Sequence, residues 1–340
     1  MRSVYVAQIG KVEVVDREVP EPGPGEVRVA TVLAGICGSD THAVAGHHPL
    51  LPPPYFPGHE ATGVVDEVGP GVTEWAKGER VIVQPNVSCG ECVNCKAGRT
   101  NACQTLQWIG CDPSGARKGA MAEFVIVPAG NLFRVPDAVT DEQAVLVECL
   151  ATPVHAARIA GDLHGAKVLV IGAGTIGLFA LIAALRAGAS AVVVSDLDAT
   201  KRDRAVRCGA VAALDPAERD LPARVREVLG GPVDAVFDCV ANEFSVKDAV
   251  GSIRRSGTLL IVGVPPRDIT VPLPFVQDWE LKVQGCANYT GVDIDTAIGI
   301  AAEGGLPADE VIAACYGIED AAAAFDAAAL NSSGKVVLKP

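Results

Sequence analysis

The stretch AKVLVIGAGTIGLFALIAALRAGASAVVVSDLD, residues 166–198, joins three apolar segments of different kinds. A short run of Val, Leu and Ile comes first, a longer Ala-rich segment follows, and a second run of valines leads to Asp196. Strands that are buried on both faces are apolar throughout, and a helix usually connects two parallel strands. The stretch therefore predicts a strand, a helix and a parallel second strand of an α/β sheet.

The same alternation continues toward the C-terminus. Apolar runs recur at 233–240 and 257–264, with a helix candidate at 244–254 between them. Together these segments predict a doubly wound parallel sheet. Residues 1 to about 150 instead hold short β-like runs separated by Pro and Gly, and the first 26 residues predict a strand or hairpin.

After the last of these strands the regular alternation fades. Two helix candidates, 293–305 and 318–330, precede a final strand-like segment, GKVVLKP. We expect this tail to close back onto the first domain. In the second helix, Ile318, Phe325 and Leu330 predict one apolar face that packs on a core.

The composition limits the possible partners. Of the 340 residues, 49% are hydrophobic, which supports compact folding. Acidic residues outnumber basic ones by 41 to 28, and the resulting net charge of -13 repels nucleic acid and anionic membranes. The N-terminus lacks the apolar core of a signal peptide, and no apolar run approaches the roughly 20 residues of a membrane span. These features predict a cytoplasmic protein.

Three glycines in the opening stretch, Gly172, Gly174 and Gly177, have the GxGxxG spacing of a dinucleotide-binding loop. Gly172 would form the tight turn, and Gly174 would let the backbone approach a pyrophosphate. Gly177 would let helix and strand pack closely, so that the N-terminus of the helix stabilises the phosphates.

Asp196 ends the second strand, 19 residues after Gly177. A carboxylate there accepts hydrogen bonds from an adenosine ribose, and its charge repels a 2′-phosphate. The pattern therefore favours NAD(H) over NADP(H). Lys201 and Arg202 follow closely and leave NADP(H) open.

The stretch CGECVNCKAGRTNAC, residues 89–103, places four cysteines within fifteen residues. The chain has 11 cysteines, an odd number, and the other seven are scattered in the way expected of reduced thiols. Four thiolates at this spacing suit one tetrahedral zinc ion, and two disulfides are the alternative. We expect zinc at this loop.

Two further motifs, GICGSDTH and PGHEATG, hold residue types that a catalytic zinc requires: Cys37 in the first, His59 and Glu60 in the second. A catalytic zinc needs three protein ligands and one open position. Glu148, at the junction between the domains, is the best candidate for the third ligand. Chemistry alone leaves the neighbouring Cys149 open as well.

Taken together, these motifs resemble the zinc-containing medium-chain alcohol and polyol dehydrogenases, and within them the sorbitol dehydrogenases. The resemblance runs end to end and rests on GICGSDTH, GHEATGVVDEVG, the CxxCxxCx7C loop, GAGTIG and DLDATK. It implies an α/β fold in which a Rossmann domain with a doubly wound parallel sheet, residues 154–286, is inserted in a mainly β, GroES-like catalytic domain, residues 1–153 and 287–340. The catalytic domain would carry a structural zinc lobe at about 86–110.

The resemblance also implies two zinc sites per chain. Cys37 and His59 would bind the catalytic zinc, with Glu60 or Glu148 as the third ligand. The structural zinc would be held by Cys89, Cys92, Cys95 and Cys103.

Three residues of the first motif would act in the reaction. Ser39 would pass the substrate hydroxyl proton toward the cofactor ribose, His42 would release it to solvent, and Asp40 would orient the zinc-bound His59. Contacts to the cofactor would come from Gly172, Gly174, Thr175, Ile176, Gly177, Asp196, Lys201, Val262, Gly263, Val264 and Asn288.

The implied activity is hydride transfer between NAD(H) and a secondary alcohol, polyol or cyclitol, or the matching ketone, in a homodimer or homotetramer. Two departures from sorbitol dehydrogenases alter the polyol contacts: Ala43 replaces an aromatic residue, and Asn288 and Tyr289 replace an Arg-Tyr pair. L-Threonine and primary alcohols or aldehydes stay alternative substrates. A non-catalytic zinc protein is a remote alternative, because the cysteine loop lacks the basic surroundings of zinc ribbons that bind nucleic acid.

Overall fold

The computed structural model describes residues 1–48, 51–218, 220–265, 267–330 and 334–340. Its internal contacts divide the chain into two compact units. Unit 1 comprises residues 1–148 and 290–340, and unit 2 comprises residues 149–289. The domain boundaries at 153 and 287 that we expect from the sequence stay a prediction.

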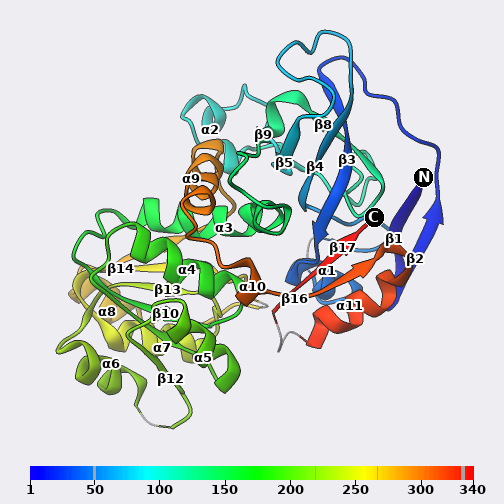
Figure 1. The fold of residues 1–340 in the computed structure, drawn as a ribbon. Coiled ribbons are helices and arrows are strands. Elements are labelled where there is room, and N and C mark those ends of the chain that lie inside the picture. The colour runs from blue at the N-terminus through cyan, green and yellow to red at the C-terminus, as the bar shows by residue number, and fades with distance from the viewer. Residues whose placement is uncertain (49–50, 219, 266, 331–333) are drawn as a thin grey trace. The chain divides into compact units, whose positions relative to one another are not determined.

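Unit 2 is built on a six-stranded parallel sheet (Figure 1). The strand order is β12-β11-β10-β13-β14-β15, and every neighbouring pair is parallel. Strand order reverses between β10 and β13, as in doubly wound dinucleotide-binding folds, which confirms the predicted fold class. The strands are β10 (Lys167–Ile171), β11 (Ala191–Ser195), β12 (Ala212–Leu214), β13 (Val233–Asp238), β14 (Ile253–Ile261) and β15 (Lys282–Gly285).

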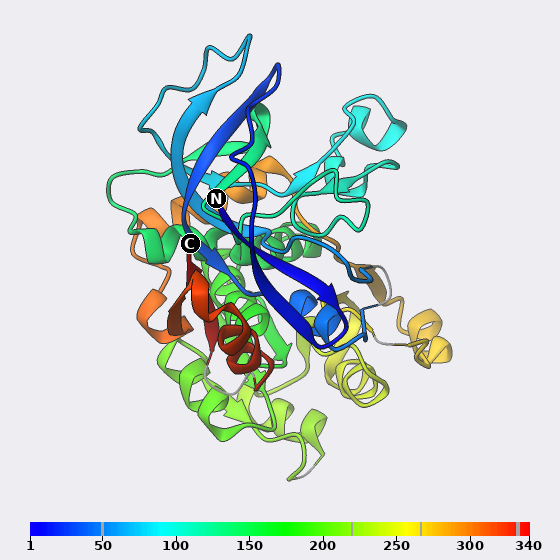
Figure 2. The ribbon, with the colours of Figure 1, turned by 90° about the vertical axis from the view of Figure 1, so that its right-hand side faces the viewer.

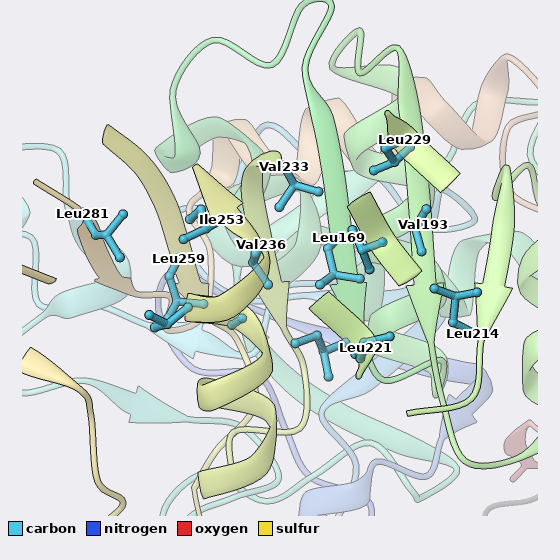
Figure 3. Packing of buried hydrophobic residues seen from close by; sticks show 14 residues of the cluster. Leu169, Val193, Leu214, Leu221, Leu229, Val233, Val236, Ile253, Leu259 and Leu281 are labelled. Atoms are coloured by element: carbon cyan, nitrogen blue, oxygen red, sulfur yellow. The ribbon is translucent and has the colours of Figure 1, made fainter. Parts of the chain in front are cut away.

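Helices connect these strands. They are α4 (Thr175–Arg186), α5 (Ala199–Arg207), α6 (Leu221–Leu229), α7 (Glu243–Ser252) and α8 (Leu273–Asp278), while α3 (Asp141–Ala160) runs from unit 1 into unit 2. Leu169, Val193, Val236 and Leu259 each come from a different strand and share one buried cluster with residues of α6 and α7 (Figure 3). The apolar runs of the sequence therefore form the centre of this sheet.

Unit 1 contains a second, mainly antiparallel sheet. Its strand order is β16-β17-β3-β4-β5-β9, with β8 paired to β3, and two short sheets pair β1 with β2 and β6 with β7. The antiparallel β1–β2 pair confirms the predicted N-terminal hairpin. The strands are β1 (Arg2–Gln8), β2 (Lys11–Asp16), β3 (Glu26–Gly35), β4 (Glu60–Val68), β5 (Arg80–Val83), β6 (Asn86–Val87), β7 (Gln107–Trp108), β8 (Phe124–Pro128), β9 (Leu132–Arg134), β16 (Ile312–Gly317) and β17 (Lys335–Lys339).

The C-terminal strand returns to the N-terminal part of the chain, as predicted. β17 pairs antiparallel with β3, where Val337 lies opposite Gly35. Figures 1 and 2 show this return as a red segment beside the blue strands. Residues from the two ends of the chain therefore lie next to each other at the end of β3.

The helices of unit 1 are short. They are α1 (Gly38–Val44), α2 (Val93–Lys96), α9 (Gly291–Ala302), α10 (Ala308–Val311) and α11 (Ala321–Leu330), with single 3-10 turns at Thr100–Ala102, Ala129–Asn131 and Ile318–Asp320. Within the described parts of the chain, no helix has both the length and the apolarity to cross a membrane.

The C-terminal helix corrects one prediction. Ile318 and Phe325 are buried in a cluster with residues of β1, β3 and β17, as predicted. Leu330, which the sequence pattern predicts on the same face, is 80% exposed. At about 3.6 residues per turn, the step of five positions from Phe325 to Leu330 rotates the side chain by about 500°, or about 140° past a full turn, so it points away from the core.

Candidate active site

The cysteine loop closes on itself within unit 1. The sulfur atoms of Cys89, Cys92, Cys95 and Cys103 all lie within 4.8 Å of one another. Cys92 and Cys95 are 3.5 Å apart, as are Cys103 and Cys89, and Cys89 and Cys95 are 4.0 Å apart. A tetrahedral zinc with Zn–S bonds of about 2.3 Å separates its sulfurs by roughly 3.8 Å, whereas a disulfide measures about 2.05 Å. The loop geometry fits a zinc ion and not disulfides.

Backbone N–H groups of the same loop point at these sulfurs. The N–H of Cys89 donates to Cys103 Sγ at 3.3 Å, that of Cys92 to Cys89 Sγ at 3.4 Å, and that of Cys95 to Cys92 Sγ at 3.5 Å. Hydrogen bonds from backbone N–H groups lower the pKa of Cys89 to about 6. Because zinc binds thiolates, these donors favour the metal-binding form of Cys89, whereas burial raises the pKa of Cys95 to about 11.

A second cluster forms where β3 ends and β4 begins. Cys37 lies between β3 and α1, and His59 and Glu60 stand at the start of the neighbouring strand β4. The ligand atoms of Cys37, His59 and Glu60 lie within 4.8 Å of one another, and a carboxylate oxygen of Glu148 lies within 4.8 Å of Glu60. The structure therefore brings the four predicted ligands of the catalytic metal together, with Glu60 close to each of the other three.

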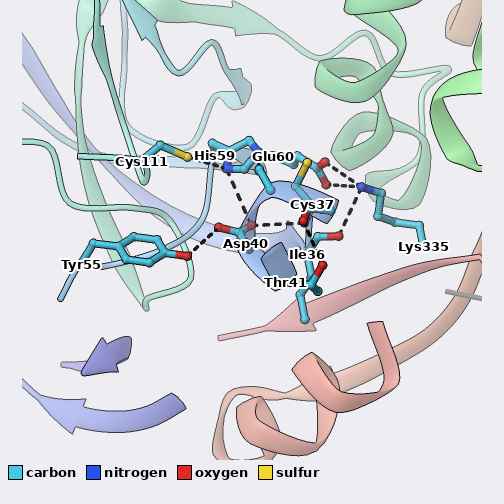
Figure 4. A network of polar contacts seen from close by, with 11 residues as sticks. Ile36, Cys37, Asp40, Thr41, Tyr55, His59, Glu60, Cys111 and Lys335 are labelled. Atoms are coloured by element: carbon cyan, nitrogen blue, oxygen red, sulfur yellow. Dashed lines mark hydrogen bonds and ion pairs between the residues drawn. The ribbon is translucent and has the colours of Figure 1, made fainter. Parts of the chain in front are cut away.

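Glu60 also forms a buried ion pair with Lys335. The Lys335 ammonium lies 2.6 and 2.8 Å from the two carboxylate oxygens and donates to the carbonyl of Ile36 at 3.3 Å (Figure 4). Lys335 is 6% exposed and Glu60 is 1% exposed. Sequence reasoning missed this lysine. The only signal in the sequence is a lysine directly before the apolar residues of the final strand.

His59 is bracketed by three side chains. Cys111 Sγ lies 3.3 Å from Nδ1, Asp40 Oδ2 lies 3.8 Å from the same nitrogen, and Ser39 Oγ lies 3.5 Å from Nε2. Burial lowers the pKa of His59, but the charges of Cys111 and Asp40 raise it more, so that it lies well above its usual value. Sequence reasoning placed Cys111 among the scattered thiols, because no motif links it to His59.

The remaining residues of the first motif lie on α1. Asp40 is fully buried; its Oδ2 accepts a hydrogen bond from the backbone N–H of Cys37 at 3.2 Å, and its Oδ1 accepts one from the Tyr55 hydroxyl at 3.4 Å. Burial raises the pKa of Asp40. Ser39 is half-buried and His42 is exposed. Asp40 thus supports the turn at Cys37 directly.

Ala43, where the resemblance to sorbitol dehydrogenases leads us to expect an aromatic residue, is buried on α1. It packs with Val6, Leu51 and Tyr55. A small side chain at this position fits the space between the helix and these residues. The Ala43 side chain is therefore part of the hydrophobic core.

The glycine loop of unit 2 has the geometry that its motif predicts. Gly172 follows β10 with φ +93°, and a Cβ at Gly177 would overlap the carbonyl of Gly172. Gly174 is the residue before α4, and no side chain caps this end of the helix. The first backbone N–H groups of α4, which lie at the carboxyl end of the sheet, are therefore available to bind a phosphate group.

Asp196 stands at the end of the neighbouring strand β11. Its carboxylate accepts hydrogen bonds from the backbone N–H groups of Ala173, at 2.7 Å, and Asp198, at 2.9 Å. Arg202 donates to the carbonyls of Asp196 and Leu197 at 2.8 and 2.9 Å and pairs with an acidic side chain, Asp215, at 3.1 Å. The guanidinium is thus held beside Asp196.

Most of the other predicted cofactor residues lie at the same sheet edge. Thr175 and Ile176 begin α4, and residues 262–264 follow the end of β14. Val262 is buried, and Val264 is 78% exposed. Parallel strands bring their carboxyl ends to one edge, which is where ligands bind in such sheets. Two residues stand outside these loops, Lys201 on α5 and Asn288 beyond β15.

Comparison with known proteins agrees with this architecture. Residues 23–137 match the alcohol dehydrogenase GroES-like domain, and residues 175–303 match the zinc-binding dehydrogenase family. The chain is 32% identical to L-galactonate-5-dehydrogenase of Escherichia coli, over 93% of this chain and 92% of that protein. It is 31% identical to sorbitol dehydrogenase of Gallus gallus, over 99% and 96%. It is also 31% identical to L-threonine 3-dehydrogenase of Deinococcus deserti, over 95% and 94%.

Two solved structures with the same fold contain a nicotinamide cofactor. A zinc-binding dehydrogenase of Sinorhizobium meliloti bound to NADP matches with a TM-score of 0.93 at 32% identity, covering 100% of this chain and 99% of that one. An alcohol dehydrogenase of Escherichia coli complexed with NADH matches with a TM-score of 0.92 at 29% identity, covering 100% and 99%. The chain therefore belongs to the zinc-containing medium-chain alcohol and polyol dehydrogenases, enzymes that transfer a hydride between an alcohol and a nicotinamide cofactor.

Proposed function

We propose that this enzyme oxidises a polyol, a cyclitol or another secondary alcohol with NAD⁺, using two zinc ions per chain, and reduces the matching ketone in reverse. The observation that carries the proposal is the cluster of one thiol, one imidazole and one carboxylate in Cys37, His59 and Glu60. Zinc accepts all three ligand types, and three protein ligands leave a fourth position for a substrate oxygen. A zinc ion held there acts as a Lewis acid that polarises the alcohol oxygen and lowers its pKa.

Glu60 is our proposed third ligand, with Glu148 as the alternative. Lys335 contacts both oxygens of Glu60 and so keeps its carboxylate beside Cys37 and His59. A carboxylate has lone pairs for several partners, so one oxygen can bind a metal while the other keeps Lys335. Zinc analysis of Glu60→Gln and Glu148→Gln tests the choice: the first variant loses the catalytic zinc, and loss in the second alone would reverse the assignment.

The proton path begins at α1. Ser39 lies beside the ligand cluster, 3.5 Å from His59 Nε2, and His42, three residues later, is exposed to solvent. We assign Ser39 the role of accepting the proton that the substrate hydroxyl loses, and His42 that of releasing it to water. Histidine suits this release because its ring nitrogens can both accept and donate a proton. Asp40 acts by holding the backbone at Cys37.

The cofactor that we propose is NAD(H), which supplies the hydride acceptor in alcohol oxidation. Asp196 would accept hydrogen bonds from the adenosine ribose. The bonds of Arg202 to two carbonyls and to Asp215 leave the guanidinium poorly placed for a 2′-phosphate, which supports NAD over NADP. The proposed contacts are Gly172, Gly174, Thr175, Ile176, Gly177, Asp196, Lys201, Val262, Gly263, Val264 and Asn288.

The second zinc is structural in this proposal and is held by Cys89, Cys92, Cys95 and Cys103. We also propose a homodimer or homotetramer. β15 is the last strand of the parallel sheet, and the preceding α8 exposes Leu273 by 66% and Phe275 by 47%. Exposed apolar side chains near a sheet edge suit a second copy of the chain. Light scattering of the purified protein would measure its mass directly.

NADH absorbance tests the activity. The zinc-loaded protein is assayed with NAD⁺ or NADP⁺ against polyols, cyclitols, sugar acids, L-threonine and primary alcohols, with Cys37→Ala as the control. We expect turnover on a secondary alcohol with NAD⁺ and none in the control. Turnover that survives in Cys37→Ala, or none on any alcohol with both zinc ions bound, would contradict the proposal.

L-Threonine oxidation is the second candidate, because L-threonine 3-dehydrogenases also match nearly the whole chain at 31–32% identity. Its reacting group is likewise a secondary hydroxyl. The same assay separates the two candidates: a kcat/KM for L-threonine above that of every polyol in the panel would favour the second.

A further inference from the structure

We propose that Cys111 is a positioning residue for His59: its sulfur accepts the hydrogen bond of the Nδ1–H and so leaves Nε2 for the catalytic zinc. The inference rests on the proposed function in that it takes His59 to be a zinc ligand. It concerns a residue that none of the recognised motifs contains. Figure 4 shows Cys111 on the side of the imidazole away from Cys37 and Glu60.

The distances favour sulfur over carboxylate as the acceptor. Cys111 Sγ lies 3.3 Å from His59 Nδ1, which is hydrogen-bond distance for a sulfur atom. Asp40 Oδ2 lies 3.8 Å from the same nitrogen, beyond the range of a direct N–H···O bond. Both Asp40 oxygens already accept other hydrogen bonds, from the Cys37 backbone and from Tyr55. In this chain the carboxylate therefore supports the Cys37 turn, and the thiol is left to orient the histidine.

The loop that carries Cys111 is held against the backbone before His59. The N–H of Cys111 donates to the carbonyl of Trp108 at 3.2 Å, which closes a tight turn. Gly110, within that turn, approaches Gly58 so closely that a Cβ would overlap the Gly58 backbone. The indole of Trp108 meets the imidazole edge-on, with ring centres 6.2 Å apart and planes at 87°. Turn and indole together fix the sulfur relative to the ring.

The chemical consequence follows from the two nitrogens of histidine. A neutral imidazole that binds a metal through one nitrogen carries its proton on the other, and an acceptor for that proton sets the tautomer and the ring orientation. Nε2 faces Ser39, on the side of the ligand cluster. A thiol is a weaker acceptor than a carboxylate, so it orients the ring while adding less electron density to it.

Metal binding by Cys111 variants tests this inference. Cys111→Val removes the acceptor and keeps the volume, Cys111→Ser restores an acceptor, and Cys315→Ser, at an exposed cysteine of β16, is the matched control. The rate of zinc release into excess chelator is measured for each variant. The phase of release that is absent in Cys37→Ala is the one that belongs to the catalytic site. The visible spectrum after cobalt substitution reports the ligand geometry independently of turnover.

We expect Cys111→Val to release the catalytic zinc about 10- to 100-fold faster and to change the cobalt spectrum. Cys111→Ser recovers most of the difference, and Cys315→Ser behaves as wild type. Wild-type release and spectrum in Cys111→Val would overturn the inference. Equal losses in Cys111→Ser and Cys111→Val with the same fall in Tm would also overturn it, because packing alone would then explain them. If the wild type holds only the lobe zinc, the proposed function itself fails.

Discussion

The two proposed metal sites of unit 1 are assembled in opposite ways. The cysteine loop takes all its ligands from residues 89–103, and all of them are sulfur. The catalytic cluster takes Cys37 from the end of β3, His59 and Glu60 from the start of β4, and Glu148 from α3. Further partners reach it from residues 111 and 335. One site is local and saturated, and the other is distributed and has mixed ligands.

This difference indicates that the cysteine loop contributes to stability and that the distributed cluster contributes to the reaction. Four thiolates complete the coordination of a zinc ion, so the loop leaves no position for substrate. The distributed cluster instead offers Cys37, His59 and one carboxylate, which is Glu60 in our proposal, and its geometry depends on the register of the surrounding sheet. Changes in the loop should therefore affect folding of the lobe, whereas changes in the cluster should affect turnover.

The largest expected effect is on the loop. Cys103→Ser removes one ligand from the saturated site, and because zinc binding there is coupled to local folding, we expect loss of that zinc and several kcal/mol of stability. Metal analysis and thermal unfolding measure both. A variant that loses this zinc but keeps its Tm would show that the loop is ordered without metal, and one that keeps the zinc would show that three thiolates are enough to hold it.

The second effect is on the cluster. Cys37→Ser removes the soft ligand from the catalytic site, and we expect kcat to fall by about 10³-fold, equivalent to about 4 kcal/mol, with little change in Tm. NADH formation and calorimetry on the same preparation measure the two quantities. A Tm that falls as far as in Cys103→Ser would erase the distinction between the sites.

The third effect concerns the buried ion pair. In a Cys37→Ala background, Lys335→Met leaves the Glu60 carboxylate buried without its cation, which we expect to lower the free energy of unfolding by about 3–5 kcal/mol. Adding Glu60→Gln removes the charge and restores most of the loss. Denaturant unfolding of the series measures it. If the free energy of unfolding were the same with Lys335→Met alone and with Lys335→Met plus Glu60→Gln, the ion pair would not hold the cluster.

The smallest expected effect concerns an exposed ion pair, which serves as the comparison for the buried pair of Lys335 and Glu60. Lys77 pairs with Asp66 at 3.1 Å, but its side chain is 78% exposed. Because solvent screens such pairs, Lys77→Ala should change the free energy of unfolding by no more than about 1 kcal/mol. Denaturant unfolding under the same conditions provides the comparison. If Lys77→Ala lowered the free energy of unfolding as much as Lys335→Met does, burial would not explain the strength of the Lys335–Glu60 pair.

Sequence patterns predicted the grouping of the four loop sulfurs and the parallel sheet, because both depend on spacing within a short segment. The sulfurs of the loop and the glycines after β10 follow from neighbours along the chain. Lys335 and Cys111 could not be assigned in this way, since one depends on the pairing of β17 with β3 and the other on a loop packed against Gly58. The prediction for Leu330 was wrong for a simpler reason: a residue five positions beyond Phe325 does not lie on the same face of the helix.

Anomalous diffraction at the zinc edge tests the central claim most directly. Crystals of the zinc-loaded protein should give two peaks per chain. The account predicts one peak among the four loop sulfurs and one bounded by Cys37, His59 and Glu60, with Cys111 Sγ within hydrogen-bond distance of His59 Nδ1. A single peak in the loop, or a second peak away from Cys37 and His59, would contradict it.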